Sequence, residues 1–148
     1  MYELMLSFGS ILIAVLLGNY WTSTGTWYEN LDKPDLNPTS RLISSVWSSL
    51  YFLIFFSFYL VLIEDPSFYV ISIFMFQLFL NALWSYNFFF RKSPKYGLIN
   101  ILLLNLFIII TIILFYNISI VASLLLFPYL VWVMFATYLN YNIYKLNQ

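Results

Sequence analysis

The sequence predicts an all-α integral membrane protein, a bundle of five transmembrane helices. Of its 148 residues, 63% are hydrophobic and only 8% are charged. Because about a quarter of the residues in a soluble domain are charged, the apolar surface of this chain must face lipid. Five apolar stretches each approach or exceed the ~20 residues that a helix needs to cross a hydrocarbon core. They lie near 4–22, 42–63, 66–90, 96–116 and 120–144, in a single domain over 1–148 with one long polar loop at 23–41.

The first stretch, 4–22, must be distinguished from a cleaved signal peptide. Its leading segment holds Glu3 where a signal peptide carries Lys or Arg, and no clear small-residue cleavage site follows it. We therefore expect a retained helix. Helices are expected throughout, because an open strand would leave backbone groups without hydrogen-bond partners in lipid.

The ends of the later stretches carry helix start signals. Asp65-Pro66 and Ser93-Pro94 each place a capping side chain before a proline at the first position of the third and fourth helices. Thr39 or Ser40 can cap the second helix, and Ser119 the fifth. Pro128 lies inside the fifth stretch and should kink it, because proline removes the hydrogen bond to the carbonyl four residues earlier.

The basic residues predict how the bundle is oriented. Five spans place the long loop, the connection at 91–95 and the C-terminus on one side of the membrane. All six basic residues fall on that side, at Lys33, Arg41, Arg91, Lys92, Lys95 and Lys145. Since positive loops stay in the cytoplasm, we predict an external N-terminus and a cytoplasmic C-terminus. We expect a bacterial inner membrane rather than a mitochondrial outer membrane, a choice that the charge distribution alone does not decide.

Polar and aromatic side chains form stripes on three of the predicted helices, and they recur at helical spacing. The stripes are Ser44, Trp47, Ser48 and Tyr51 on the second helix; Gln77, Asn81, Trp84, Ser85 and Phe88 on the third; and Trp132, Ala136 and Asn140 on the fifth. Amide side chains in hydrocarbon need partners, so these faces should point into the bundle. One interpretation is that they only hold the helices together. The other is a cavity with flat aromatic walls, which suits a flat and largely apolar ligand.

Composition excludes several classes of function. A net charge of zero provides no basic surface for nucleic acid. The chain has no cysteine and no histidine, so it lacks a thiolate nucleophile, the commonest general base and the commonest metal ligand, and no metal site is expected. No intramembrane ionisable residue is available to couple an ion gradient, which argues against active transport.

Motifs from the loop to the C-terminus resemble the tryptophan-rich sensory protein (TspO/MBR) family, whose mitochondrial relatives are the translocator proteins, or peripheral benzodiazepine receptors. The loop and the second helix contribute Trp27-Tyr28-x-x-Leu31-x-Lys33-Pro34, Pro38, Val46-Trp47 and Leu50-Tyr51. The third helix contributes Asn81, Trp84-Ser85 and Phe88-Phe89, and the fifth contributes Pro128-Tyr129-Leu130-x-Trp132, Phe135-Ala136-Thr137-x-Leu139-Asn140 and Tyr144-x-x-Asn147. The five spans of this family agree with the count made above.

The resemblance implies a ligand site and a set of partners. Family members are bundles, often homodimers, that bind porphyrins such as protoporphyrin and haem beneath the first loop, and some bind sterols. Carried over by motif, the ligand-binding residues are Trp47, Tyr51, Asn81, Trp84, Trp132, Ala136 and Asn140, with Trp27, Pro34 and Pro38 in a lid loop. No cofactor is required; the porphyrin is the ligand.

Three functions remain open at this point. The first is a membrane receptor or sensor that binds tetrapyrroles and possibly sterol-like molecules. The second is an enzyme that degrades porphyrin in light, with Trp47 and Trp132 as the candidate catalytic residues. The third is a passive carrier of porphyrin or sterol. Because no histidine or cysteine can ligate iron, metal-free porphyrin is expected to bind at least as well as haem.

Overall fold

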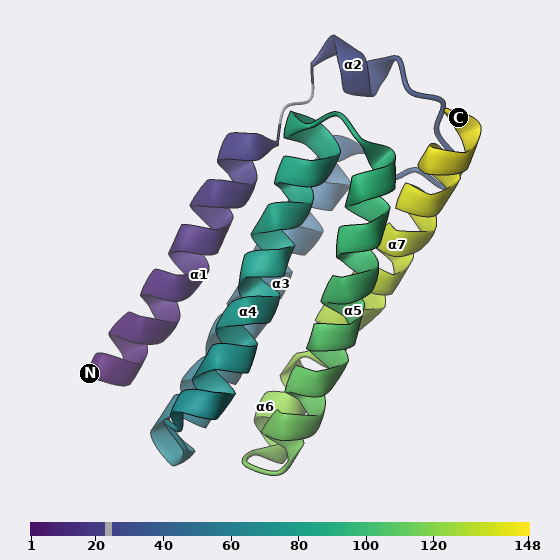
Figure 1. Ribbon diagram of the computed structural model, residues 1–148. Helices are drawn as coiled ribbons and strands as arrows, with labels where there is room; N and C mark the ends of the chain where they lie inside the picture. Colours follow the sequence, from purple (N-terminus) through teal and green to yellow (C-terminus); the bar gives the residue numbers. More distant parts are fainter. Residues whose placement is uncertain (23–24) are drawn as a thin grey trace.

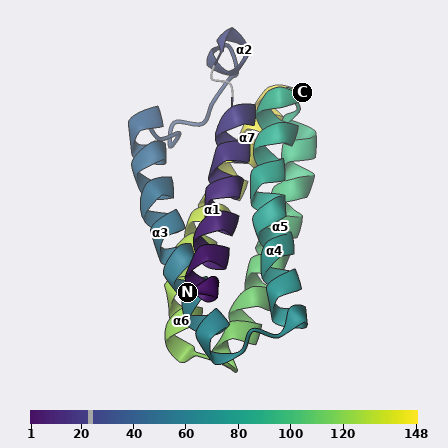
Figure 2. The same ribbon diagram turned by 90° about the vertical axis from the view of Figure 1, so that its left-hand side faces the viewer.

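The computed structural model describes residues 1–22 and 25–148, and all regular secondary structure in these ranges is helical. Within them, five helices are long and apolar enough to span a membrane, which confirms the predicted fold class. They run over Tyr2–Trp21, Ser40–Glu64, Phe68–Phe90, Pro94–Tyr116 and Ile120–Leu146. Figure 1 and Figure 2 show them side by side in one bundle, with the N-terminus at one end and the C-terminus at the other.

The first two spans meet at one end of the bundle and separate at the other. Near the N-terminus of α1 (Tyr2–Trp21), the Ser7 hydroxyl donates to the Phe55 carbonyl of α3 (Ser40–Glu64) at 2.9 Å. At its other end α1 contacts α4 (Phe68–Ser85) instead, where the Thr22 hydroxyl donates to the Ser85 hydroxyl at 3.2 Å. The predicted start of α3 is confirmed, since the Thr39 hydroxyl accepts from the backbone N–H of Leu42.

The third span starts later than the sequence predicts. Its first part, α4, runs over Phe68–Ser85, and Ser67 rather than Asp65 occupies the capping position. The Asp65 carboxylate instead accepts from the backbone N–H of Ser67 at 3.1 Å. Asp65 therefore closes the turn around Pro66, and the proline stays outside the helix.

The same span ends in a π-helical turn, η1 (Tyr86–Phe90), which the sequence analysis does not predict. The Arg91 N–H donates to the Tyr86 carbonyl at 2.9 Å and closes this wider turn. Turns of this kind insert an extra residue and are frequent at functional sites. Here the insertion brings both Phe88 and Phe89 to the wall of the cavity described below.

The last two spans follow their predicted signals with one difference. Helix α5 (Pro94–Tyr116) has Pro94 in its first turn and is capped by Ser93, as predicted. The fifth span does more than kink, because it breaks into α6 (Ile120–Leu125) and α7 (Phe127–Leu146). Pro128 therefore lies in the first turn of α7. A backbone N–H there would have no partner within the helix, so the N–H that proline lacks is not missed.

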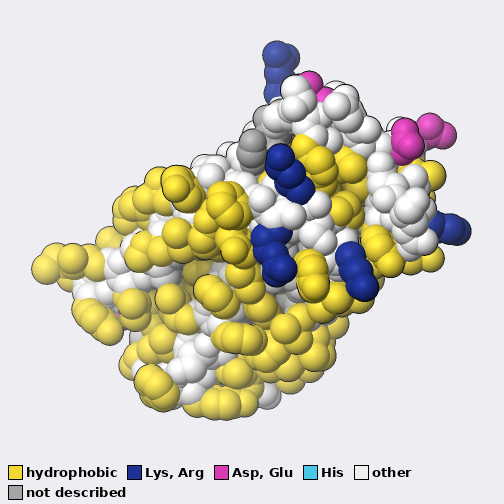
Figure 3. Space-filling model, turned by 45° about the horizontal axis from the view of Figure 1, so that its top comes forward, with side chains coloured by type: hydrophobic (Ala, Val, Ile, Leu, Met, Phe, Trp, Pro, Cys, Tyr) yellow, Lys and Arg dark blue, Asp and Glu magenta, His cyan; other side chains and the backbone are white. Residues whose placement is uncertain are grey.

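The bundle ends differ in charge. The segment 25–39, which contains the short helix α2 (Thr26–Glu29), lies over the end at which the chain finishes (Figure 1). Figure 3 brings this end forward and shows Lys and Arg side chains spread around it, with hydrophobic side chains on the flank below. The charge asymmetry on which the predicted orientation depends is therefore present in the folded protein.

Candidate ligand-binding site

A cavity of about 430 Å³ lies in the half of the bundle beneath segment 25–39. None of the described residues that line it is charged. All seven side chains predicted to bind a ligand lie around it, namely Trp47, Tyr51, Asn81, Trp84, Trp132, Ala136 and Asn140. The three stripes found in the sequence therefore converge on one space, since they come from α3, α4 and α7.

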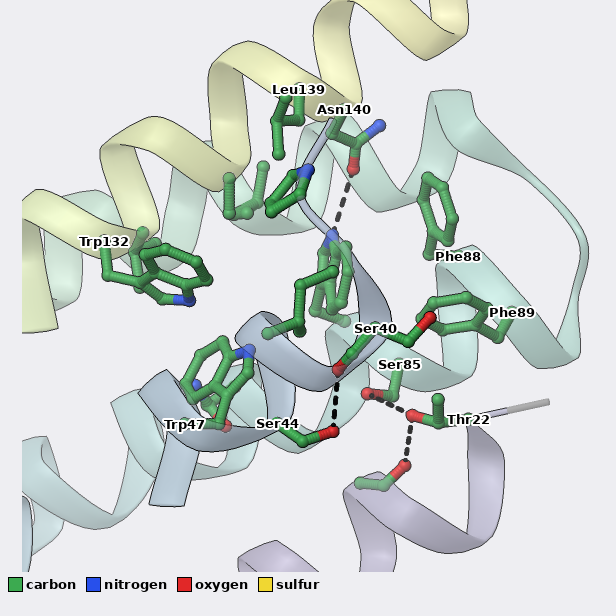
Figure 4. A pocket seen from close by; sticks show the side chains of 18 of the residues that line it. Thr22, Ser40, Ser44, Trp47, Ser85, Phe88, Phe89, Trp132, Leu139 and Asn140 are labelled. Atoms are coloured by element: carbon green, nitrogen blue, oxygen red, sulfur yellow. Dashed lines mark hydrogen bonds between the residues drawn. The ribbon is translucent and has the colours of Figure 1, made fainter. Parts of the chain in front are cut away.

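Two indoles form the aromatic walls of the cavity. Trp132 projects from α7 and Trp47 from α3, toward the same space (Figure 4). The Trp47 indole packs against the rings of Tyr51 and Tyr129, with centroid distances of 5.5 and 6.2 Å. The Trp132 Nε1–H is buried and has no acceptor among the described residues, so it is a hydrogen-bond donor available to a ligand.

A chain of four polar side chains runs from the cavity wall into the core. The Tyr51 hydroxyl donates to Asn81 Oδ1 at 2.7 Å, and Asn81 Nδ2 donates to the Tyr129 hydroxyl at 3.0 Å. The Tyr129 hydroxyl donates in turn to Gln77 Oε1 at 3.1 Å. These bonds fix Asn81 within the bundle, because a buried amide without partners is costly in an apolar environment.

A second amide, Asn140 on α7, connects three helices. Its Oδ1 accepts from Trp84 Nε1 at 3.0 Å, and its Nδ2 donates to the Pro94 carbonyl at 2.8 Å. Gly97 gives it the space to do so, because a Cβ at that position would lie 2.9 Å from Asn140 Oδ1. The Trp84 indole also stacks on Phe88, with ring centroids 5.2 Å apart. Trp84 is therefore a fixed part of the wall.

The three residues predicted for the lid loop lie in different places. Pro38 lines the cavity, together with Tyr28 and Asn37 of the same segment. Trp27 does not line it and packs edge-on against Phe88, with ring centroids 5.9 Å apart. Pro34 lies in a shallow hollow against the end of α7.

Segment 25–39 is joined to the C-terminus by a pair of hydrogen bonds. The Asp32 N–H donates to Asn147 Oδ1 at 3.0 Å, and Asn147 Nδ2 donates to the Asp32 carbonyl at 2.9 Å. These residues are 115 positions apart in the chain. The amide of Asn147 thus pairs with the backbone of Asp32 and holds the segment over the bundle.

The first helix contributes a wall that the sequence analysis does not predict. Val15, Gly18 and Asn19 of α1 line the cavity, as does Thr22 directly after its last residue. Their spacing of three and four residues places them on one helical face. This periodicity was the available signal, and it is weak because the helix is apolar on all sides and its stripe contains no tryptophan.

The chain is similar in sequence to several known proteins over most of its length. Residues 7–146 match the model of the TspO/MBR family. The chain is 39% identical to the tryptophan-rich protein TspO of Archaeoglobus fulgidus, over 98% of this chain and 97% of that protein. It is also 39% identical to the protein of the same name in Chlorobaculum tepidum, over 97% and 95%. It is 32% identical to the human translocator protein, over 82% and 75%. The chain therefore belongs to the TspO/MBR family.

Proposed function

We propose that the protein is a membrane receptor or sensor that binds a tetrapyrrole, such as protoporphyrin or haem, in the cavity beneath segment 25–39. The observation that carries this proposal is the pair of indoles, Trp47 and Trp132, on the walls of one uncharged cavity. Flat aromatic walls favour a flat ligand with a large π-system, because rings bind one another by stacking. A volume of about 430 Å³ lies within the range of small-molecule sites in proteins.

The names of relatives support a sensory or translocating role. A protein of Cereibacter sphaeroides that is 34% identical over 82% of this chain is called a tryptophan-rich sensory protein. The human relative is called a translocator protein. The arrangement of this chain favours binding over hydrolysis, because the described cavity wall offers amides, hydroxyls and indoles but no acid–base pair.

A porphyrin titration in lipid nanodiscs tests the proposal. Binding of protoporphyrin is followed in the dark by the shift of its main absorption band, a signal that does not depend on the number of tryptophans. We expect saturable binding that is weakened about tenfold in Trp47→Phe and in Trp132→Phe, since each change removes indole contact area and, at Trp132, the free N–H.

Trp21→Phe is the matched control, because Trp21 packs on Tyr86 and does not line the cavity. It should bind as the unmodified protein does. An unchanged dissociation constant in both cavity variants, or the absence of saturable binding, would overturn the proposal.

The iron in haem gives a further distinction within this ligand class. Tyr28 and Tyr51 are the tyrosines that line the cavity, and the Tyr51 hydroxyl already donates to Asn81. Neutral tyrosine is a poor iron ligand compared with histidine or cysteine. We therefore expect metal-free protoporphyrin to bind at least as tightly as haem, and competition between the two in the same titration measures this.

A second function is favoured by the position of the same two indoles. A porphyrin held between Trp47 and Trp132 places oxidisable rings beside a pigment that is excited by light. Light-dependent degradation of the porphyrin in the presence of dioxygen would then follow from binding. We expect the bound pigment to bleach faster under illumination in the unmodified protein than in Trp47→Phe/Trp132→Phe at equal occupancy. Equal bleaching rates would contradict this second function and leave ligand binding as the function.

A further inference from the structure

The residues that line the cavity fall into two classes by exposure. Those beneath segment 25–39 and deep in the bundle are buried or half-buried. Five are exposed, and each is polar and uncharged: Asn19, Thr22, Ser40, Ser44 and Ser48. Asn19 belongs to α1, Thr22 directly follows that helix, and the three serines belong to α3. The cavity therefore opens to the outside along one line, between these two helices.

The separation of α1 and α3 explains where this opening lies. The helices touch near the N-terminus of α1, where the Phe8 and Phe55 rings are 6.4 Å apart. Toward its C-terminal end α1 contacts the third span, where Trp21 packs against Tyr86 and Thr22 lies beside Ser85. Figure 2 shows the first turns of α3 standing apart from α1 at this end, and Figure 4 shows Thr22 and Ser44 on the two sides of the opening.

The α3 side of this opening is lined by hydroxyl groups. Ser40, Ser44 and Ser48 follow one face of α3 over its first ~12 Å, at 1.5 Å per residue. Ser45 and Ser49 of the same turns are also exposed, but only the face of Ser40, Ser44 and Ser48 lines the cavity. The Ser44 and Ser48 hydroxyls donate to the carbonyls four residues earlier, which keeps their oxygens available as acceptors. Within the described residues, the Ser40 hydroxyl and the Asn19 amide make no side-chain hydrogen bond.

We propose that the cavity is filled sideways from the membrane through this opening, and that the Ser40 hydroxyl and the Asn19 amide, which can donate, hold the polar end of an amphiphilic ligand. The flat apolar body of the ligand then lies farther in, between Trp47 and Trp132. This inference rests on the proposed function and adds the route and the orientation of the ligand. Entry from the membrane differs from entry from the aqueous side in one respect: segment 25–39 stays in place while the ligand binds.

The matched residues Ser45 and Ser49 make the proposal testable. They are exposed on the same helix and make the same hydrogen bonds to carbonyls four residues earlier, but they do not line the cavity. Because the chain contains no cysteine, Ser44→Cys and Ser45→Cys each create a unique thiol. Serine and cysteine are close in size, so both variants can be folded first and modified afterwards with a bulky thiosulfonate.

Stopped-flow mixing with protoporphyrin in nanodiscs is the measurement. The bulky adduct at position 44 should slow association and dissociation at least tenfold, the adduct at position 45 should leave both rates unchanged, and reductant should restore the rates. Equal rates for the two adducts would contradict ligand entry between α1 and α3 and would leave the proposed function intact. No saturable binding to the protein without substitutions would overturn both.

The orientation of the ligand is tested with protoporphyrin and its dimethyl ester. In Ser40→Ala/Asn19→Ala the affinity for the free acid should fall about tenfold, because the hydroxyl and amide donors that can bind a carboxylate are lost, and the affinity for the ester should fall less. The matched control is Ser45→Ala/Ser49→Ala, which should alter neither affinity. Equal losses for acid and ester would place the carboxyl groups elsewhere and overturn the orientation.

Discussion

At the scale of single residues, the site depends on close contacts that no stripe in the sequence reveals. Trp84 and Asn140 are both predicted from their helical faces, but their hydrogen bond joins side chains 56 positions apart. Whether two such residues meet depends on how near the helices approach. At this point the approach depends on Gly97, because α5 packs there against Asn140 and Phe88 without an intervening side chain.

Gly97→Ala tests this close contact. The added methyl would lie 2.9 Å from Asn140 Oδ1 and 3.0 Å from a Phe88 ring carbon, so Asn140 must shift. We expect a destabilisation of about 1–3 kcal/mol, as for other overpacked sites, and weaker porphyrin binding. Thermal unfolding in detergent and the titration above measure the two effects.

Gly9→Ala is the control for that change, since a methyl there would meet nothing within 4 Å. It should leave stability unchanged or raise it slightly, because glycine weakens a helix relative to alanine. Equal unfolding temperatures for the two variants would contradict the close contact at Gly97.

Tyr51→Phe tests the polar chain on the cavity wall. The change removes the donor to Asn81 Oδ1 and should cost about 1 kcal/mol, near the values measured for side-chain hydrogen bonds in membranes. Tyr59→Phe, on the same helix, removes a hydroxyl that makes no hydrogen bond within the described residues and should have no effect. Steric trapping or thermal unfolding would distinguish the two, and equal losses would contradict a role for the bond.

At the scale of helices, hydropathy located the spans and local chemistry located most of their ends. Thr39, Ser93 and Pro94 act as predicted. The π turn at Tyr86–Phe90 and the break at Leu126 did not follow from the sequence, because both depend on packing against other helices. The break, for example, lets the Ser57 hydroxyl of α3 reach the Ala122 carbonyl at 2.7 Å.

The segment over the cavity provides a prediction at this scale. Asn147→Ala removes both hydrogen bonds to Asp32, so the amides of 25–39 should exchange with deuterium several-fold faster. Asn117→Ala is the control: Asn147 Nδ2 also donates to the Ile143 carbonyl, and Asn117 Nδ2 makes the equivalent bond to the Ile113 carbonyl at the other end of the bundle. Unchanged exchange in Asn147→Ala would show that other contacts hold the segment.

At the scale of the whole molecule, the family and the five spans establish a membrane protein, and the charge distribution predicts its orientation. The composition alone predicted the membrane class, and the five spans predicted that the termini lie at opposite ends (Figure 1). The convergence of three stripes on one cavity was also predictable. The contribution of α1 was not, because nothing in its sequence indicates which helix its face meets.

The predicted orientation can be measured directly. Reporter fusions after Gln148 and within 117–119 should report opposite sides of a bacterial inner membrane, with the C-terminus in the cytoplasm, because all six basic residues lie on the side of the C-terminus. Both reporters on one side would contradict the five-span topology, and reversed sides would contradict the charge argument.

The hydrogen bonds from Tyr51 to Gln77 all run in one direction, away from the cavity. The Tyr51 proton is committed to this relay, so its oxygen presents only lone pairs toward a ligand. Reversing the relay would require both amides, Asn81 and Gln77, to flip together. The inner wall at Tyr51 therefore selects groups that donate, such as a pyrrole N–H, and disfavours carboxylates, which leaves the acidic groups of a porphyrin to the opposite end of the cavity.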